Sequence, residues 1–93
     1  MNEEAFQDSA SKGDRANLLL HEPLIAKFFE ETEEKLLSGI KGSEFGDKEG
    51  RENLYQVYRL LISFKQFFER SIAEGKIASS MLEKLKAGAF DNM

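Results

Sequence analysis

The stretch RENLYQVYRLLISFKQFFERSIAEG, residues 51–75, decides the fold of this chain, because it is long, apolar on more than one side and free of proline. Its apolar residues recur every three or four positions, which predicts an amphipathic helix. Asp47 suits the N-cap of such a helix, and Gly75 stands where a left-handed C-terminal residue is favoured. The pattern therefore predicts one long central helix over residues of about 47–74.

The apolar surface of this helix is wider than one face. Leu60 and Phe67 widen it on one side, whereas Tyr55 and Ile62 lie beyond its other edge. Together with the main face they span well over half of the circumference, more than the stripe of roughly 100° that a surface helix buries. Either the other helices of the chain cover these flanks, or the flanks contact another chain. The candidate interface residues are Tyr55, Leu60, Ile62 and Phe67.

A helix corner precedes the long helix at HEPLIAKFF, residues 21–29, which holds the only histidine and the only proline of the chain. Proline disfavours a helical residue before it but suits the first position of a helix. The stretch therefore predicts one helix ending near His21, capped at its start by Asp14, and a second from Pro23 to about Ser38.

Residues 39–50 predict a turn-rich connection whose Phe45 folds back onto the core. Ser80 and Glu83 fit a capping box, which predicts a last short helix. The fold class expected is all-α, a small bundle of three to four helices. Residues 1–13 are expected to be weakly ordered, 14–88 to form a single helical domain and 89–93 to be a loose tail.

Composition restricts the function classes. The chain has 93 residues, a net charge of −4 and no cysteine, which excludes disulfides and thiolate chemistry. No basic tract suits the phosphate backbone of nucleic acid, and no apolar run approaches the roughly 20 residues that span a bilayer. The N-terminal residues do not resemble a signal peptide, so a cytoplasmic protein is expected.

The sequence contains few residues arranged for catalysis or metal binding. The glutamates of EETEE, residues 30–34, lie mostly opposite the apolar face of their helix, and no Glu-x-x-His pair accompanies them. His21 is the only imidazole and has no evident nucleophile or second ligand to serve. We therefore expect no enzyme, no catalytic residue, no metal, no cofactor and no small-molecule substrate.

Three segments together resemble a group of short, uncharacterised all-helical proteins of tailed bacteriophages and prophages, encoded among virion structure and packaging genes. The segments are LLLHEPLIAKFF (18–29), RENLYQVYRLL (51–61) and FFERSIAEGKIASSMLEKL (67–85). The shared positions are Ala16, Leu19, Leu20, Pro23, Leu24, Phe28, Arg51, Leu54, Tyr55, Gly75, Lys76, Ile77 and Ala78. The resemblance implies no known activity or ligand.

The function expected is a non-enzymatic phage structural, assembly or accessory protein that binds itself or another phage or host protein, in the host cytoplasm or the virion. A DNA-binding regulator is one alternative, because the stretch IAEGKIASSMLEKL, residues 72–85, faintly resembles a helix-turn-helix. The acidic composition of the chain argues against this alternative. A regulator that binds a host protein through the acidic second helix is the other.

Overall fold

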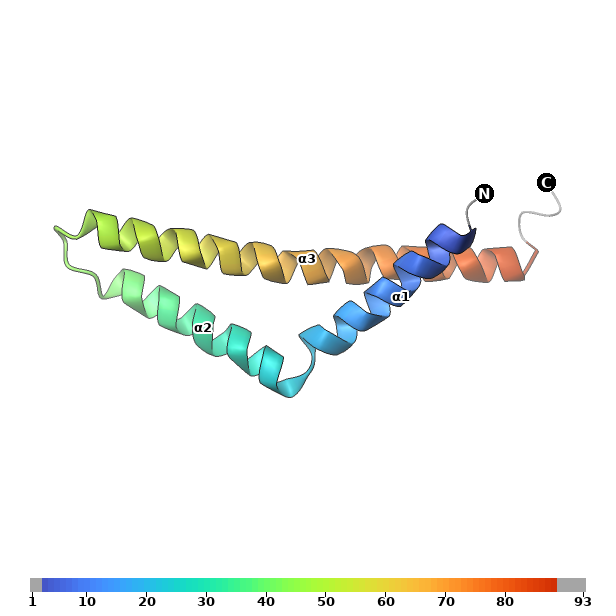
Figure 1. Cartoon of the computed structure of the whole chain (residues 1–93), viewed down its shortest axis with the longest axis horizontal. Coiled ribbons are helices and arrows are strands. Elements are labelled where there is room, and N and C mark those ends of the chain that lie inside the picture. The colour runs from blue at the N-terminus through green and yellow to red at the C-terminus, as the bar shows by residue number, and fades with distance from the viewer. Residues whose placement is uncertain (1–2, 89–93) are drawn as a thin grey trace. The chain divides into compact units, whose positions relative to one another are not determined.

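The computed structural model describes residues 3–88, and this part of the chain contains three α-helices and no strand (Figure 1). Helix α1 spans Glu3–Leu20, α2 spans Pro23–Lys41 and α3 spans Lys48–Lys86. The prediction of an all-α protein with one long helix is confirmed. The predicted tail, residues 89–93, lies outside the described residues.

The chain divides into two compact units, each of which is described by itself. Unit 1 comprises Met1–Leu20 and Phe67–Met93, so it holds α1 and the second part of α3. Unit 2 comprises His21–Gln66, so it holds α2 and the first part of α3. The interpretation of residues 14–88 as a single domain stays a prediction.

The predicted start of the first helix at Asp14 is wrong, because α1 is helical from Glu3 onward. Glu3 and Glu4 occupy its first turn, where negative charge interacts favourably with the helix dipole. Gly13, the last residue of the segment expected to be weakly ordered, is buried in the middle of the helix. Packing therefore overrides the cost of about 1 kcal/mol that glycine imposes on a helix interior.

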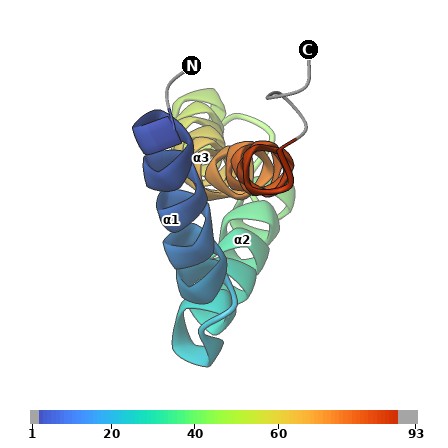
Figure 2. The ribbon, with the colours of Figure 1, turned by 90° about the vertical axis from the view of Figure 1, so that its right-hand side faces the viewer.

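Unit 1 is held together by small residues where α1 crosses the second part of α3 (Figure 2). Its buried residues are Gly13, Ala16, Ser71, Gly75 and Ala78. A Cβ atom built on Gly13 would lie 2.8 Å from the Cα of Gly75 and 2.8 Å from the carbonyl oxygen of Ser71. The two backbones therefore approach so closely that neither glycine has room for a side chain.

This crossing also explains why α3 is longer than expected. The predicted helix end at Gly75 and the separate helix starting at Ser80 are both wrong, because α3 continues through them to Lys86. Gly75 serves the contact with α1 in place of a C-cap. A capping-box pattern at Ser80 and Glu83 is a local signal, and it has no effect where the preceding turn is already helical.

The corner at His21 is confirmed. Leu20 ends α1, Glu22 has an extended backbone (φ −63°, ψ 129°), and Pro23 opens α2. The Glu22 side chain accepts a hydrogen bond of 3.0 Å from the backbone N–H of Ile25, which makes Glu22 the N-cap of α2. Since this bond satisfies a donor that the helix leaves open, the cap stabilises the first turn.

Replacing Glu22 with alanine is expected to lower the free energy of unfolding by about 1 kcal/mol, the usual effect of losing an N-cap side chain. Urea titration followed by circular dichroism measures it. Glu34→Ala removes an equal charge from the exposed side of the same helix and is the matched control. Equal destabilisation by the two variants would assign the effect to charge instead of to the cap.

The α2–α3 connection is short and internally bonded. Helix α2 runs to Lys41, three residues beyond the predicted end, and Gly42 is its C-cap. Asp47 is the predicted N-cap of α3, and its Oδ1 accepts from the N–H of Gly50 at 3.0 Å. The prediction that Phe45 folds onto the core is wrong: its side chain is 94% exposed.

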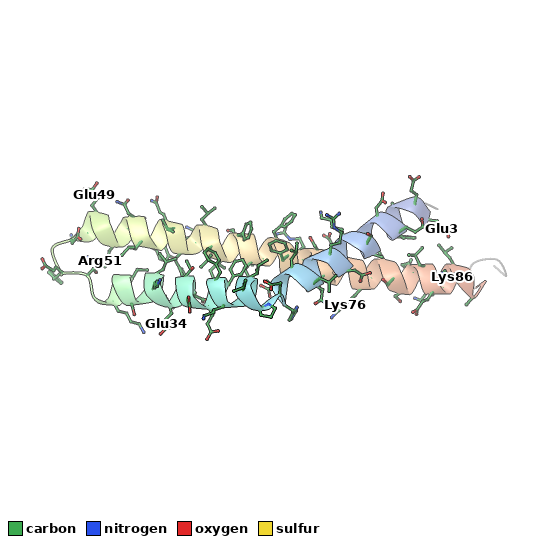
Figure 3. All side chains as sticks on the ribbon, turned by 60° about the horizontal axis from the view of Figure 1, so that its bottom comes forward. Glu3, Glu34, Glu49, Arg51, Lys76 and Lys86 are labelled. Atoms are coloured by element: carbon green, nitrogen blue, oxygen red, sulfur yellow. The ribbon has the colours of Figure 1, made fainter. Side chains whose placement is uncertain are left out.

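The physical reason for that exposure is Arg51. Its Nη1 donates to the carbonyl oxygen of Glu44 at 2.8 Å and to Ser43 Oγ at 3.3 Å, and its Nη2 donates to the carbonyl oxygen of Phe45 at 3.4 Å. These bonds hold the loop backbone at the start of α3 (Figure 3), and the Phe45 ring is left in solvent.

Unit 2 has an aromatic core. Phe29 of α2 is 5% exposed, and among the described residues it is the only large apolar side chain in the buried set. Its ring stacks on that of Phe64 of α3 with 5.7 Å between centroids. Tyr58 and Glu33 add one hydrogen bond between the two helices, with 3.5 Å between Tyr58 Oη and Glu33 Oε1.

Candidate interaction surfaces

Unit 2 presents five large apolar side chains to solvent on one side of its helix pair. We call this set the unit 2 apolar face: Leu24 and Phe28 of α2, and Val57, Leu60 and Phe64 of α3. Their exposed fractions are between 52% for Val57 and 75% for Leu24. An apolar set of this kind, gathered on one side, is typical of a protein interaction site.

The spacing of these residues and the ring contacts place them together. Leu24 and Phe28 are four residues apart, as are Leu60 and Phe64, so each pair shares one side of its helix. The buried ring of Phe29 connects the two helices, because it lies 5.9 Å from the Phe28 centroid and 5.7 Å from the Phe64 centroid. The face is therefore continuous across α2 and α3.

The four candidate interface residues do not all lie on one side of α3. Leu60, 70% exposed, belongs to the unit 2 apolar face, whereas Tyr55 and Ile62, seven residues apart on α3, share another side of that helix. Tyr55 is exposed, with the guanidinium carbon of Arg59 6.0 Å from its ring centroid, and Ile62 is half-buried. Phe67 belongs to unit 1. Their assignment as interface residues stays a prediction.

Unit 1 contains a shallow groove of about 350 Å³ in which Phe67 lies. Its apolar lining is Leu19, Phe67 and Phe68, and its cations are Lys12 and Arg15; Ala16 and Ser71 complete it. The Lys12 ammonium lies 5.0 Å from the Phe67 ring centroid, within cation–π distance. Among the described residues that line this unit 1 groove, two are basic and none is acidic.

The unit 1 groove was not predicted from the sequence, because Lys12 falls in the segment expected to be weakly ordered. A usable signal was present. Lys12, Arg15, Ala16 and Leu19 follow the spacing of one helix side, with two cations next to apolar residues. The second half of the groove comes from Phe67 and Phe68, about fifty positions away, and no local pattern connects the two halves.

Residues with acid–base or metal chemistry are not gathered in the described part of the chain. Within residues 3–88, no group of three or more His, Asp or Glu side chains is placed to hold a metal ion. Glu30, Glu31 and Glu34 are exposed on α2, and Figure 3 shows Glu34 on the outer side of this helix. His21 lies at the α1–α2 corner. No helix in the same range has the length and apolar character that crossing a bilayer requires.

Comparisons with protein-family models, curated proteins and solved structures give no match to this chain. The resemblance to phage proteins therefore rests on the sequence segments alone and stays a prediction.

Proposed function

We propose that this chain is a non-enzymatic structural or assembly protein of a tailed phage that acts through protein–protein contacts, first of all with a second copy of itself. The observation that carries the proposal is the unit 2 apolar face. Fully burying one Leu or Phe side chain is worth about 1.5–3 kcal/mol. Four such side chains and one valine, each more than half exposed, provide a strong driving force for association.

The architecture of unit 2 supports a second copy as the partner. Unit 2 is a pair of helices, and a helix pair can bury only the sides that face each other. Two copies that meet through the unit 2 apolar face would form a four-helix arrangement with the Phe28 and Phe64 rings inside. The small bundle expected from the sequence is, in this proposal, completed between copies. The contact would be isologous, with the same patch used on both sides.

Light scattering coupled to size-exclusion chromatography tests the proposal. A particle of at least twice the 10.6 kDa chain is expected at high micromolar concentration. Leu60→Lys introduces a charge at the centre of the contact and is expected to weaken dimerisation at least tenfold, about 1.4 kcal/mol. Gln66→Lys adds the same charge at an exposed polar position about 120° around α3 from Leu60, and is the matched control.

A wild-type chain that stays monomeric at this concentration would contradict self-association through the unit 2 apolar face. Equal weakening of the dimer by Leu60→Lys and Gln66→Lys would show that added charge alone, wherever it lies, is responsible.

No observation specifically favours the DNA-binding alternative. The lysines of the second part of α3, Lys76, Lys84 and Lys86, are interspersed with Glu74 and Glu83. Phosphate-driven binding depends on clustered cations.

A further inference from the structure

We propose that Phe45 of one copy inserts into the unit 1 groove of a second copy, so that copies also associate head to tail. The inference rests on the proposed function in one respect, that the chain binds itself. It uses different residues from the unit 2 apolar face, and the two contacts can be tested separately.

Phe45 has the properties of an anchor residue. At 94% it has the highest exposed fraction among the large apolar side chains of residues 3–88. Its loop is fixed by the Arg51 bonds to the carbonyl oxygens of Glu44 and Phe45, and by Ser43 Oγ, which donates to the carbonyl oxygen of Ile40 at 2.8 Å. An anchor on a bonded loop loses little conformational entropy when it binds. Aromatic side chains are also prominent among the residues that dominate binding energy.

The unit 1 groove is large enough for a phenyl ring. Its volume is about 350 Å³, and an apolar cavity of about 150 Å³ already accepts benzene. The Phe67 and Phe68 rings lie in its wall, with centroids 5.9 Å apart at an angle of 80°. An inserted ring would therefore meet aromatic neighbours, which favour edge-to-face and offset packing.

Charge selects a second copy as the occupant. Around Phe45 lie three acidic residues, Glu44, Asp47 and Glu49, against two cations, Lys48 and Arg51, and the Arg51 guanidinium is already bonded to loop carbonyl oxygens. The residues that line the groove include Lys12 and Arg15 and no acidic residue. Complementary charges of this kind orient two surfaces and exclude the wrong partners. The same acidic residues would be repelled by an anionic membrane surface, which argues against insertion of Phe45 into lipid.

The contact would be heterologous, because the anchor and the groove are different surfaces of one chain. After two copies pair, the pair as a whole retains one free anchor and one free groove, so association continues into rings or filaments. A heterologous contact can therefore be tested by complementation, in which two defective variants associate only when they are mixed. An isologous contact would not give this result.

The experiment uses full-length chains that all carry Leu60→Lys, which places a charge in the unit 2 apolar face and weakens that contact at least tenfold. Phe45→Ala disables the anchor, and the double substitution Lys12→Glu with Arg15→Glu disables the groove. Each variant alone is expected to be monomeric by light scattering. An equimolar mixture is expected to give a 1:1 heterodimer, because each variant supplies the surface that the other lacks. Circular dichroism verifies that every variant keeps its helix content.

Two controls make the result specific. Lys76→Glu with Lys84→Glu makes the same charge change on exposed lysines of unit 1 outside the groove, and it should leave head-to-tail association unchanged. Raising salt from about 50 mM to about 500 mM should weaken the heterodimer severalfold, because screening reduces the attraction of exposed charges.

The outcomes separate this inference from the proposed function. If the Leu60→Lys chain is monomeric at high micromolar concentration, or if the mixture gives no heterodimer, the head-to-tail contact is overturned while dimerisation of the parent chain stands. If Phe45→Ala alone abolishes association and Leu60→Lys does not, the head-to-tail contact stands and the proposed role of the unit 2 apolar face fails.

Discussion

Replacing Phe29 with alanine is expected to destabilise unit 2 by about 3–5 kcal/mol, the usual range for truncating a buried phenylalanine. The ring is 5% exposed and contacts Phe28 and Phe64, so its loss removes the centre of the aromatic core. A small helical unit has few other contacts that could compensate. Thermal unfolding followed by circular dichroism should show a midpoint lowered by more than about 10 °C.

Phe45→Ala is the matched control, since it deletes the same atoms from a side chain that is 94% exposed. At a protein concentration low enough to keep copies apart, we expect its free energy of unfolding to stay within about 0.5 kcal/mol of the parent value. Amide hydrogen exchange shows where the chain is destabilised: in Phe29→Ala the amides of α2 should exchange nearly as fast as those of an unprotected helix. Similar stability of the two variants would contradict the position of Phe29 in the core.

Replacing Gly13 with leucine is expected to separate α1 from the second part of α3. The first atom added, Cβ, would lie 2.8 Å from the Cα of Gly75 and 2.8 Å from the Ser71 carbonyl oxygen. Both neighbours are backbone, so no side-chain rotation relieves the clash. Leucine is a better helix former than glycine by up to about 1 kcal/mol. The steric term must exceed this gain, and overpacking commonly destabilises by about 1–3 kcal/mol or more.

Limited proteolysis and hydrogen exchange measure the result. Amides of α1 should lose protection in Gly13→Leu, together with those around Gly75 and Ala78. Ser11→Leu is the matched control, because it places the same side chain at an exposed position of the same helix. Protection of α1 that is equal in the two variants would be inconsistent with the close crossing. Gly75→Leu should reproduce the Gly13→Leu result, because its Cβ would lie 2.8 Å from the Cα of Gly13.

The sequence by itself determined the all-α class, the corner at His21–Pro23 and the start of the long helix near Asp47. These features depend on local chemistry. Proline restricts its own neighbours, Asp47 bonds a backbone donor three residues away, and apolar periodicity repeats within a few turns. The sequence also identified exposed apolar positions on α3, Leu60 among them, since too many apolar residues for one face can be counted without coordinates.

Only the tertiary structure decided which glycines interrupt a helix and which lie within one. Gly75 was predicted to end a helix and Gly13 falls in the segment expected to be weakly ordered, yet each is buried inside a helix because the other lies against it. Likewise, the bonds from Arg51 decided that Phe45 faces solvent, and α1 and α3 together decided that Lys12 lies over the Phe67 ring. The glycine crossing, the exposure of Phe45 and the position of Lys12 share one physical reason. Each depends on a contact with a residue that local sequence patterns do not identify, and the energy of that contact exceeds the helix propensity of any single residue.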